Sequence, residues 1–195
     1  PVTWTFASHP NALPGGASLR NNVITAIQAD ASKRVWIGTD HDGLLQFDVR
    51  TGVLRPFPLP SSAPVRTVTD IALTRTGKLI VACGHSGLFV IDARTGYSRH
   101  IDLDGTSSAP GGGGAMRVAM DSARYLWVGS DNNRIHRYDI RTGKWRQYRI
   151  PIGVGSNYVV EIRDMAMDLE RNLWISTSGD GVFVMQTESG SFTHL

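Results

Sequence analysis

Short runs of apolar residues follow one another along the chain, and clusters of Gly, Asp, Asn and Ser separate them. Many residues in these runs are β-branched or aromatic, which is typical of β-strands bounded by turns. No segment keeps the helical period of about 3.6 residues over a window of about 11 residues. The pattern therefore predicts an all-β protein.

The runs form a unit that repeats along the chain. A Thr-Gly or Ser-Gly pair recurs with its glycine at 52, 96, 143 and 190, which gives spacings of 44, 47 and 47 residues. The same spacings separate a set of bulky apolar residues, Trp36, Ile80, Trp127 and Trp174. Six residues before them lie Asp30, Thr74, Asp121 and Asp168. Three sets of landmarks in one register indicate four copies of a unit of about 44–47 residues.

Each unit contains four predicted strands, named a to d in chain order. Strand a covers 23–29, 69–73, 116–120 and 162–167, and strand b covers 35–39, 79–83, 126–130 and 173–177. Strand c covers 44–48, 88–92, 135–139 and 182–186, and strand d covers 53–57, 97–101, 144–148 and 191–195. A four-stranded unit that repeats every 40–50 residues or so is typical of a β-propeller blade.

The sequence thus predicts an all-β fold, a β-propeller with four four-stranded blades, in a single region that spans residues 1–195. The blades cover about 23–58, 68–101, 115–149 and 161–195. Residues 1–22 are interpreted as the last strand of a preceding blade, with the WTF segment at 4–6, and a connector. This extra strand favours part of a larger propeller, and a closed ring of four blades is the alternative. The end blades of an open segment would expose apolar faces, which favours self-association.

Several recurring residues have structural explanations. The glycine of each Thr-Gly or Ser-Gly pair supplies the positive φ angle of a hairpin turn, and the Asp that precedes it in three units bonds local amides. The tryptophans are interpreted as core residues that fill the space between blades. Small residues two positions later allow the next blade to approach, at Gly38, Ala82, Gly129 and Ser176. Cys83 is interpreted as a small buried residue.

The first unit resembles the two-component regulator propeller repeat. The matching residues are Ser18, Leu19, Asn22, Asp30, Trp36, Ile37, Gly38, Thr39, Gly43, Leu44, Asp48, Thr51 and Gly52. Later units depart from the pattern at Ile80, Arg134 and Gln186. In this family such repeats form sensory propellers outside the inner membrane of bacteria, which act on a histidine kinase or a diguanylate cyclase. The resemblance therefore implies a periplasmic, non-catalytic, ligand-sensing propeller of a two-component or cyclic-dinucleotide signalling receptor.

Composition and charge argue against several other classes. The chain has 20 Lys and Arg residues and 17 Asp and Glu residues, a net charge of +3. This charge is too small and too dispersed to indicate a nucleic-acid partner. No run of about 18 apolar residues indicates a transmembrane helix, so no membrane contact is expected within this segment. A single cysteine excludes an internal disulfide.

Candidate binding residues lie in the loops between strands b and c and in the connectors between blades, which meet on one face of a propeller. These b–c loops cover 40–43, 84–87, 131–134 and 178–181. The candidates are Asn22, Asp40, His41, Asp42, Arg66, His85, Ser86, Arg117, Asp131, Asn132, Tyr158, Glu161 and Asp180. Polar and aromatic groups at a channel mouth suit a small polar ligand. No cofactor and no metal are expected. The 40–43 loop lacks the acidic series and terminal Glu of a calcium loop, and His41 and His85 have no obvious third ligand to complete a metal site.

Two other functions are alternatives. A propeller lyase would use His41 or His85 with Glu161 as acid–base partners, which would then lie within one hydrogen bond or one water of each other. A protein-interaction scaffold of the WD-repeat kind is the third class, although the WD and GH dipeptides of that kind are missing at the right places. The recurring turn arginines are interpreted as solvated residues, namely Arg50, Arg94 and Arg141.

Overall fold

The computed structural model describes residues 23–61, 65–101, 114–121, 124–130, 133–152 and 160–195. These residues form sixteen strands and no helix, so the all-β prediction is confirmed. Each strand begins and ends within one residue of the expected bounds, because the turn residues between the apolar runs fix both ends. The strands form four antiparallel sheets, and each sheet contains four strands that are consecutive in the chain.

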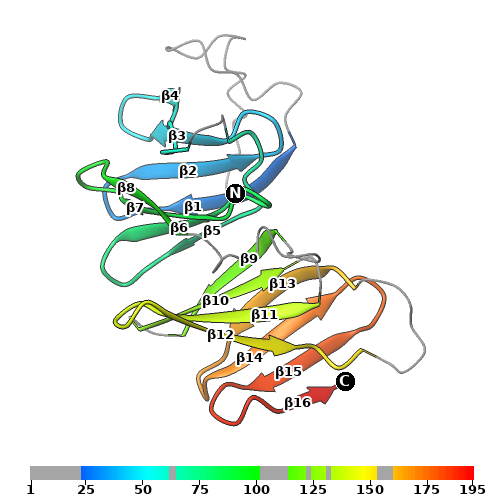
Figure 1. The fold of residues 1–195 in the computed structure, drawn as a ribbon. Coiled ribbons are helices and arrows are strands. Elements are labelled where there is room, and N and C mark those ends of the chain that lie inside the picture. Colours follow the sequence, from blue (N-terminus) through cyan, green and yellow to red (C-terminus); the bar gives the residue numbers. More distant parts are fainter. Residues whose placement is uncertain (1–22, 62–64, 102–113, 122–123, 131–132, 153–159) are drawn as a thin grey trace, which may run out of the picture.

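Each sheet corresponds to one predicted blade (Figure 1). Blade 1 contains β1 (Ile24–Ala29), β2 (Arg34–Thr39), β3 (Leu44–Asp48) and β4 (Val53–Pro56). Blade 2 contains β5 (Asp70–Leu73), β6 (Lys78–Ala82), β7 (Leu88–Asp92) and β8 (Ser98–Ile101). Blade 3 contains β9 (Ala115–Met120), β10 (Tyr125–Ser130), β11 (Arg134–Asp139) and β12 (Lys144–Arg149). Blade 4 contains β13 (Ile162–Met167), β14 (Asn172–Thr177), β15 (Val182–Gln186) and β16 (Phe192–His194). The first strands of successive blades contact one another, so they form the inner side of an arc.

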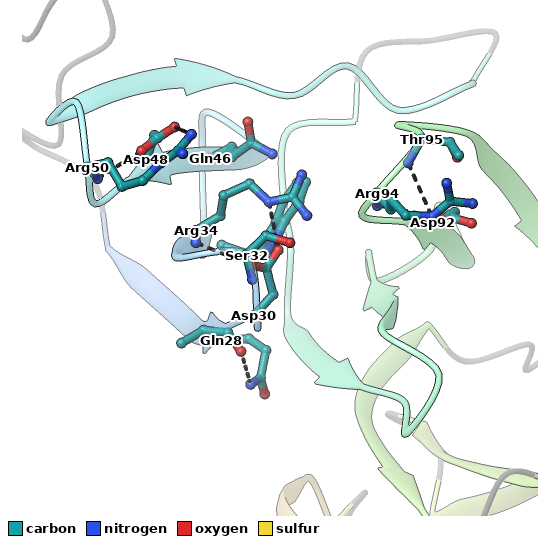
Figure 2. Close-up of polar contacts among 12 residues, drawn as sticks. Gln28, Asp30, Ser32, Arg34, Gln46, Asp48, Arg50, Asp92, Arg94 and Thr95 are labelled. Atoms are coloured by element: carbon teal, nitrogen blue, oxygen red, sulfur yellow. Dashed lines mark hydrogen bonds and ion pairs between the residues drawn. The ribbon is translucent and has the colours of Figure 1, made fainter.

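The turns between the third and fourth strands repeat one geometry. Their glycines have φ angles of 69°, 76°, 69° and 79°, at Gly52, Gly96, Gly143 and Gly190. Glycine adopts this region without steric cost. The Asp48 carboxylate accepts a hydrogen bond from the Arg50 amide at 2.8 Å (Figure 2), and Asp92 and Asp139 accept the matching bonds at 2.9 Å. The Arg124 guanidinium, together with amides of the turn, lowers the pKa of Asp139 to about 2.

Apolar layers between successive blades form the core. Trp36 packs in the layer between blades 1 and 2, and Trp127 packs in the layer between blades 3 and 4. Both side chains are fully buried, which confirms the core prediction for these two tryptophans, whereas the prediction is wrong for Trp174, which is 41% exposed. Ile80 occupies the matching position between blades 2 and 3. Burial raises the pKa of the Cys83 thiol to about 12, so this thiol is not a nucleophile at neutral pH.

Small residues let neighbouring blades approach, as their register predicts. A Cβ atom added at Gly38 would lie 2.7 Å from Cγ1 of Val68, which belongs to the chain leading into blade 2. A Cβ atom added at Gly129 would lie 2.9 Å from Cδ1 of Ile162 in blade 4. Both distances are shorter than carbon atoms in van der Waals contact allow. The close approach of the blades therefore depends on glycine at these two positions.

The two end blades each present an apolar face without a described neighbour. Ile27 in blade 1 is 66% exposed, whereas the residues of the same register in the other blades are 6%, 6% and 7% exposed, namely Ile71, Val118 and Met165. Trp174 in blade 4 is 41% exposed, against 0% for Trp127. No hydrophobic cluster of the described residues joins blade 1 to blade 4, and Figure 1 shows these blades at opposite ends of the arc. The strand and connector predicted within 1–22 lie outside the described residues.

We expect Trp127→Ala to lower the free energy of unfolding by about 3–5 kcal/mol, because it removes a fully buried aromatic side chain from an interblade layer. The matched control is Trp174→Ala, at the same register on the exposed face of blade 4. Urea unfolding followed by circular dichroism measures both variants. Equal losses of stability would contradict the assignment of Trp127 to a layer between blades.

Candidate functional site: the loop face

The described candidate residues lie at one edge of the blades, where the second strands end and the next blades begin. Asp40, His41 and Asp42 follow β2, His85 and Ser86 follow β6, and Asp180 follows β14. Arg66 precedes β5, Arg117 lies in β9, and Glu161 precedes β13. We call this edge the loop face. The other four candidates lie outside the described residues, namely Asn22, Asp131, Asn132 and Tyr158.

Hydrogen bonds bring the loop of blade 1 together with the chain that leads into blade 2. The Gly43 amide donates to the Arg66 carbonyl at 2.6 Å. Thr67 Oγ1 donates to the Asp40 carbonyl at 2.9 Å. The Asp40 and His41 side chains form an exposed pair, with Oδ2 and Nδ1 3.5 Å apart. The structure thus brings three of the candidates together, Asp40 and His41 in the loop of blade 1 and Arg66 in the adjoining chain.

Two histidines that the sequence analysis missed close the loops of blades 2 and 4. His100 donates from Nε2 to the Ser86 carbonyl at 2.8 Å, and His194 donates from Nε2 to the Asp180 carbonyl at 2.8 Å. The His194 ring also stacks on Phe183, with centroids 4.4 Å apart. The two histidines are 94 residues apart in the sequence, which equals two repeats of 47 residues. Their common register is the signal that could have identified them.

Arg117 connects three blades on the inner side of the loop face. Its Nη1 donates to the Thr69 carbonyl beside β5 at 3.1 Å and to the Met116 carbonyl in its own strand at 2.7 Å. Its Nε donates to the Arg163 carbonyl in β13 at 2.6 Å. A charged donor makes stronger hydrogen bonds than a neutral one. Arg117, which the sequence analysis predicts to bind a ligand, therefore links blades 2, 3 and 4 through its hydrogen bonds.

Two carboxylates share the register of Arg117 on the neighbouring inner strands, Asp70 in β5 and Asp164 in β13. The Val118 amide donates to Asp70 Oδ2 at 2.9 Å, which links blades 2 and 3. Burial raises the pKa of Asp70, although the Val118 and Ile71 amides and the Arg117 charge oppose the shift. The sequence analysis missed both carboxylates, although each is one repeat of 47 residues from Arg117.

No histidine of the described loops forms an ion pair with Glu161, the carboxylate of the lyase alternative. Glu161 Oε2 lies 3.0 Å from Nη2 of Arg163, and His41 pairs with its neighbour Asp40. In the described part of the chain, no three His, Cys, Asp or Glu side chains come together to hold a metal ion. The side chains of the described loop face thus include an exposed Asp40–His41 pair and an exposed Glu161–Arg163 ion pair.

Residues 18–41 match the two component regulator propeller family. The matched segment contains the lead-in residues and the Trp-bearing strand of the first unit. The resemblance expected from the sequence is thereby confirmed for this segment. No curated protein matches the chain.

Solved structures share the fold at low sequence identity. The extracellular domain of BT3049, a predicted hybrid two component system of B. thetaiotaomicron, matches 91% of this chain with a TM-score of 0.74 and 18% identity. The extracellular domain of BT4673 from the same organism matches 88% with a TM-score of 0.71 and 19% identity. PorZ, a surface component of the type-IX secretion system of Porphyromonas gingivalis, matches 100% with a TM-score of 0.65 and 16% identity. The chain spans 24%, 22% and 29% of these structures, respectively, and the likeness confirms the propeller fold.

We expect Arg117→Met to lower the free energy of unfolding by about 1.5–3 kcal/mol, because three carbonyl groups of three blades lose a charged donor. The control is Arg163→Met, whose exposed side chain pairs with Glu161 and should change the stability by less than about 1 kcal/mol. Urea unfolding measures both. If Arg117→Met costs no more than the control, the bonds of Arg117 do not hold the arc together.

Proposed function

We propose that this chain is a non-catalytic, ligand-binding part of the sensor region of a bacterial two-component or cyclic-dinucleotide signalling receptor. The observation that carries the proposal is the match of residues 18–41 to the regulator propeller family. The fold, which is also that of extracellular domains of two component systems, supports it. The proposal places the segment in the periplasm, on the outer side of the inner membrane. Among the described residues there is no helix long and apolar enough to cross a membrane.

The loop face is the proposed binding surface. Loops on a rigid scaffold can vary without disturbing the layers that hold the blades. Asp40 and His41 are exposed beside the Arg66 backbone, and the Arg66 side chain is exposed as well. Asp180 Oδ2 is buried without a hydrogen-bond partner among the described residues, and a donor group of a ligand would satisfy it. These groups suit a small molecule with both donors and acceptors.

The proposal is tested with a panel of small polar compounds that comprises mono- and oligosaccharides, amino acids and dicarboxylates. We expect at least one class to raise the melting temperature of the chain, because a ligand that binds only the folded state stabilises it. His41→Ala and Arg66→Ala should weaken the binding of that class by about tenfold or more, as measured by calorimetric titration.

The matched controls are Arg50→Ala and Arg94→Ala, which remove exposed arginines from the turns at the opposite edge of the blades. These variants should bind as the unmodified chain does. Binding that is lost in the turn variants but kept in the loop variants would overturn the assignment of the loop face. A panel without any stabilising compound would overturn ligand binding by this segment.

We also propose that the isolated chain self-associates through the faces at the ends of the arc. Ile27 and Trp174 lie on these faces and are 66% and 41% exposed, whereas their counterparts in the other blades are buried. A second copy would cover them, and an apolar contact of this kind is insensitive to salt. Light scattering should show a mass that rises with protein concentration at low and high salt, and Trp174→Asp should lower it. A strictly monomeric chain at high concentration would contradict the proposal.

A further inference from the structure

Blades 1 and 4 contain a paired aspartate and tryptophan at the edge opposite the loop face. Trp36 Nε1 donates to Asp30 Oδ2 at 2.9 Å, and Trp174 Nε1 donates to Asp168 Oδ2 at 2.9 Å. The other oxygen of Asp30 accepts a bond from the Arg34 amide, which closes the turn between the first two strands (Figure 2). In blade 1, one carboxylate thus accepts hydrogen bonds both from the turn and from the indole that packs against blade 2.

Blade 2 has replaced both members of this pair. Thr74 stands at the aspartate position, and Ile80 stands at the tryptophan position. Thr74 Oγ1 still accepts a hydrogen bond from the Lys78 amide at 2.9 Å, so the turn is preserved. The carboxylate and the indole are absent from this layer, and the smaller isoleucine side chain leaves space beside it.

A pocket of about 270 Å³ lies between blades 2 and 3 at this place. Its walls include Ile80 and Ile101 from blade 2 and Leu126 and Tyr138 from blade 3. These four side chains are buried and belong to one hydrophobic layer. The pocket opens at the edge of the blades that carries the turn of Thr74, away from the loop face. We call it the interblade pocket.

The mouth of the interblade pocket is cationic. Arg75, Lys78 and Arg99 line it together with two threonine hydroxyl groups, and no carboxylate is among its lining residues. Lys78 lies near a counter-charge, the Asp92 carboxylate. The Thr95 and Arg94 amides lower the pKa of Asp92, and the Arg94 and Lys78 charges lower it to a smaller extent. An anionic ligand would compete with Asp92 for Lys78. Arg75 and Arg99 are therefore the cationic groups most available to such a ligand.

Arg99 differs from its counterpart in blade 1 in a way that favours a ligand. The counterpart, Arg55, donates two hydrogen bonds to Gln46 Oε1 across the sheet, at 2.8 and 2.6 Å. Arg99 instead faces Val90, which offers no side-chain acceptor. Among the described residues, the Arg99 side chain has neither a hydrogen-bond partner nor an ion-pair partner. Its guanidinium group is thus available to bind a carboxylate through two parallel hydrogen bonds.

We infer that the interblade pocket binds a small aromatic carboxylate, which supplies the ring and the acid group that blade 2 lacks. The ring lies against Ile80, Leu126 and Tyr138, and the carboxylate lies at Arg99 beside the Thr74 hydroxyl. The volume is just below the roughly 300–1,000 Å³ of pockets for drug-sized ligands, so it fits a molecule with one ring system. This site is separate from the proposed site on the loop face.

Indole-3-acetate is the test probe, with indole and acetate as partial probes that each lack one half of the chemistry. A ligand of about 13 non-hydrogen atoms with ordinary efficiency binds at about 1 mM, so NMR titration to about 10 mM detects it. We expect indole-3-acetate to shift the signals of Ile80 and Leu126 and to bind at least about tenfold more tightly than either partial probe.

Arg99→Gln should weaken binding of indole-3-acetate about tenfold, while Arg55→Gln, the same change in blade 1, should leave it unchanged. Thr74→Asp combined with Ile80→Trp restores the pair and should abolish binding while raising the melting temperature. If this double variant does not fold, the comparison of Arg99→Gln with Arg55→Gln still tests whether the pocket binds the probe. Absence of shifts in the pocket, equal binding of indole, or full binding by Arg99→Gln would overturn the inference.

Discussion

The packing of apolar side chains between successive blades is the interaction on which the rest of this structure depends. A single four-stranded sheet of short strands cannot bury its own faces, so each blade obtains its core from its neighbours. Each layer combines a bulky residue from the second strand of one blade with a close approach by the next blade. Trp36 and Gly38 serve these two purposes in blade 1, and Trp127 and Gly129 serve them in blade 3. Blade 4 keeps the bulky residue, Trp174, without a described neighbour to cover it.

The same constraint determines where binding can occur. Side chains in the middle of the strands pack in the layers between blades. Polar groups that can bind a ligand therefore lie mainly at the two edges of the blades. At the loop face, hydrogen bonds from His100 and His194 hold two loops, and Arg117 fixes the inner strands that carry other candidates. At the opposite edge, Thr74 and Ile80 leave a layer incompletely filled, and a pocket with a cationic mouth results.

The fold could be predicted from the sequence because the same pattern of strand and turn residues recurs in four units. The turn glycines, the aspartates before them and the tryptophans kept their register, and strand ends followed from them to within one residue. The candidate site could be predicted only in part. Loop membership follows from the repeat, but contacts between blades do not, because they join residues far apart in the sequence. Arg117 and the Thr69 carbonyl, 48 positions apart, are one example.

The change at Ile80 shows the same limit. From the sequence alone, isoleucine in place of the repeat's tryptophan predicts no more than a less stable blade 2. Its consequence depends on the volume left beside it, which Leu126 and Tyr138 of the next blade define. Likewise, Arg99 and Arg55 are equivalent in the repeat, and only the residue across the sheet, Val90 or Gln46, decides whether the guanidinium group is occupied.

Hydroxyl-radical footprinting with mass spectrometry tests the central claim, that packing between blades determines which repeat positions are buried. It is carried out at a protein concentration at which light scattering reports a monomer. The account predicts slow oxidation of Trp36 and Trp127, which are fully buried in layers, and fast oxidation of Trp174 at the end of the arc. Oxidation of Trp127 as fast as that of Trp174, or equal protection of all three, would contradict it.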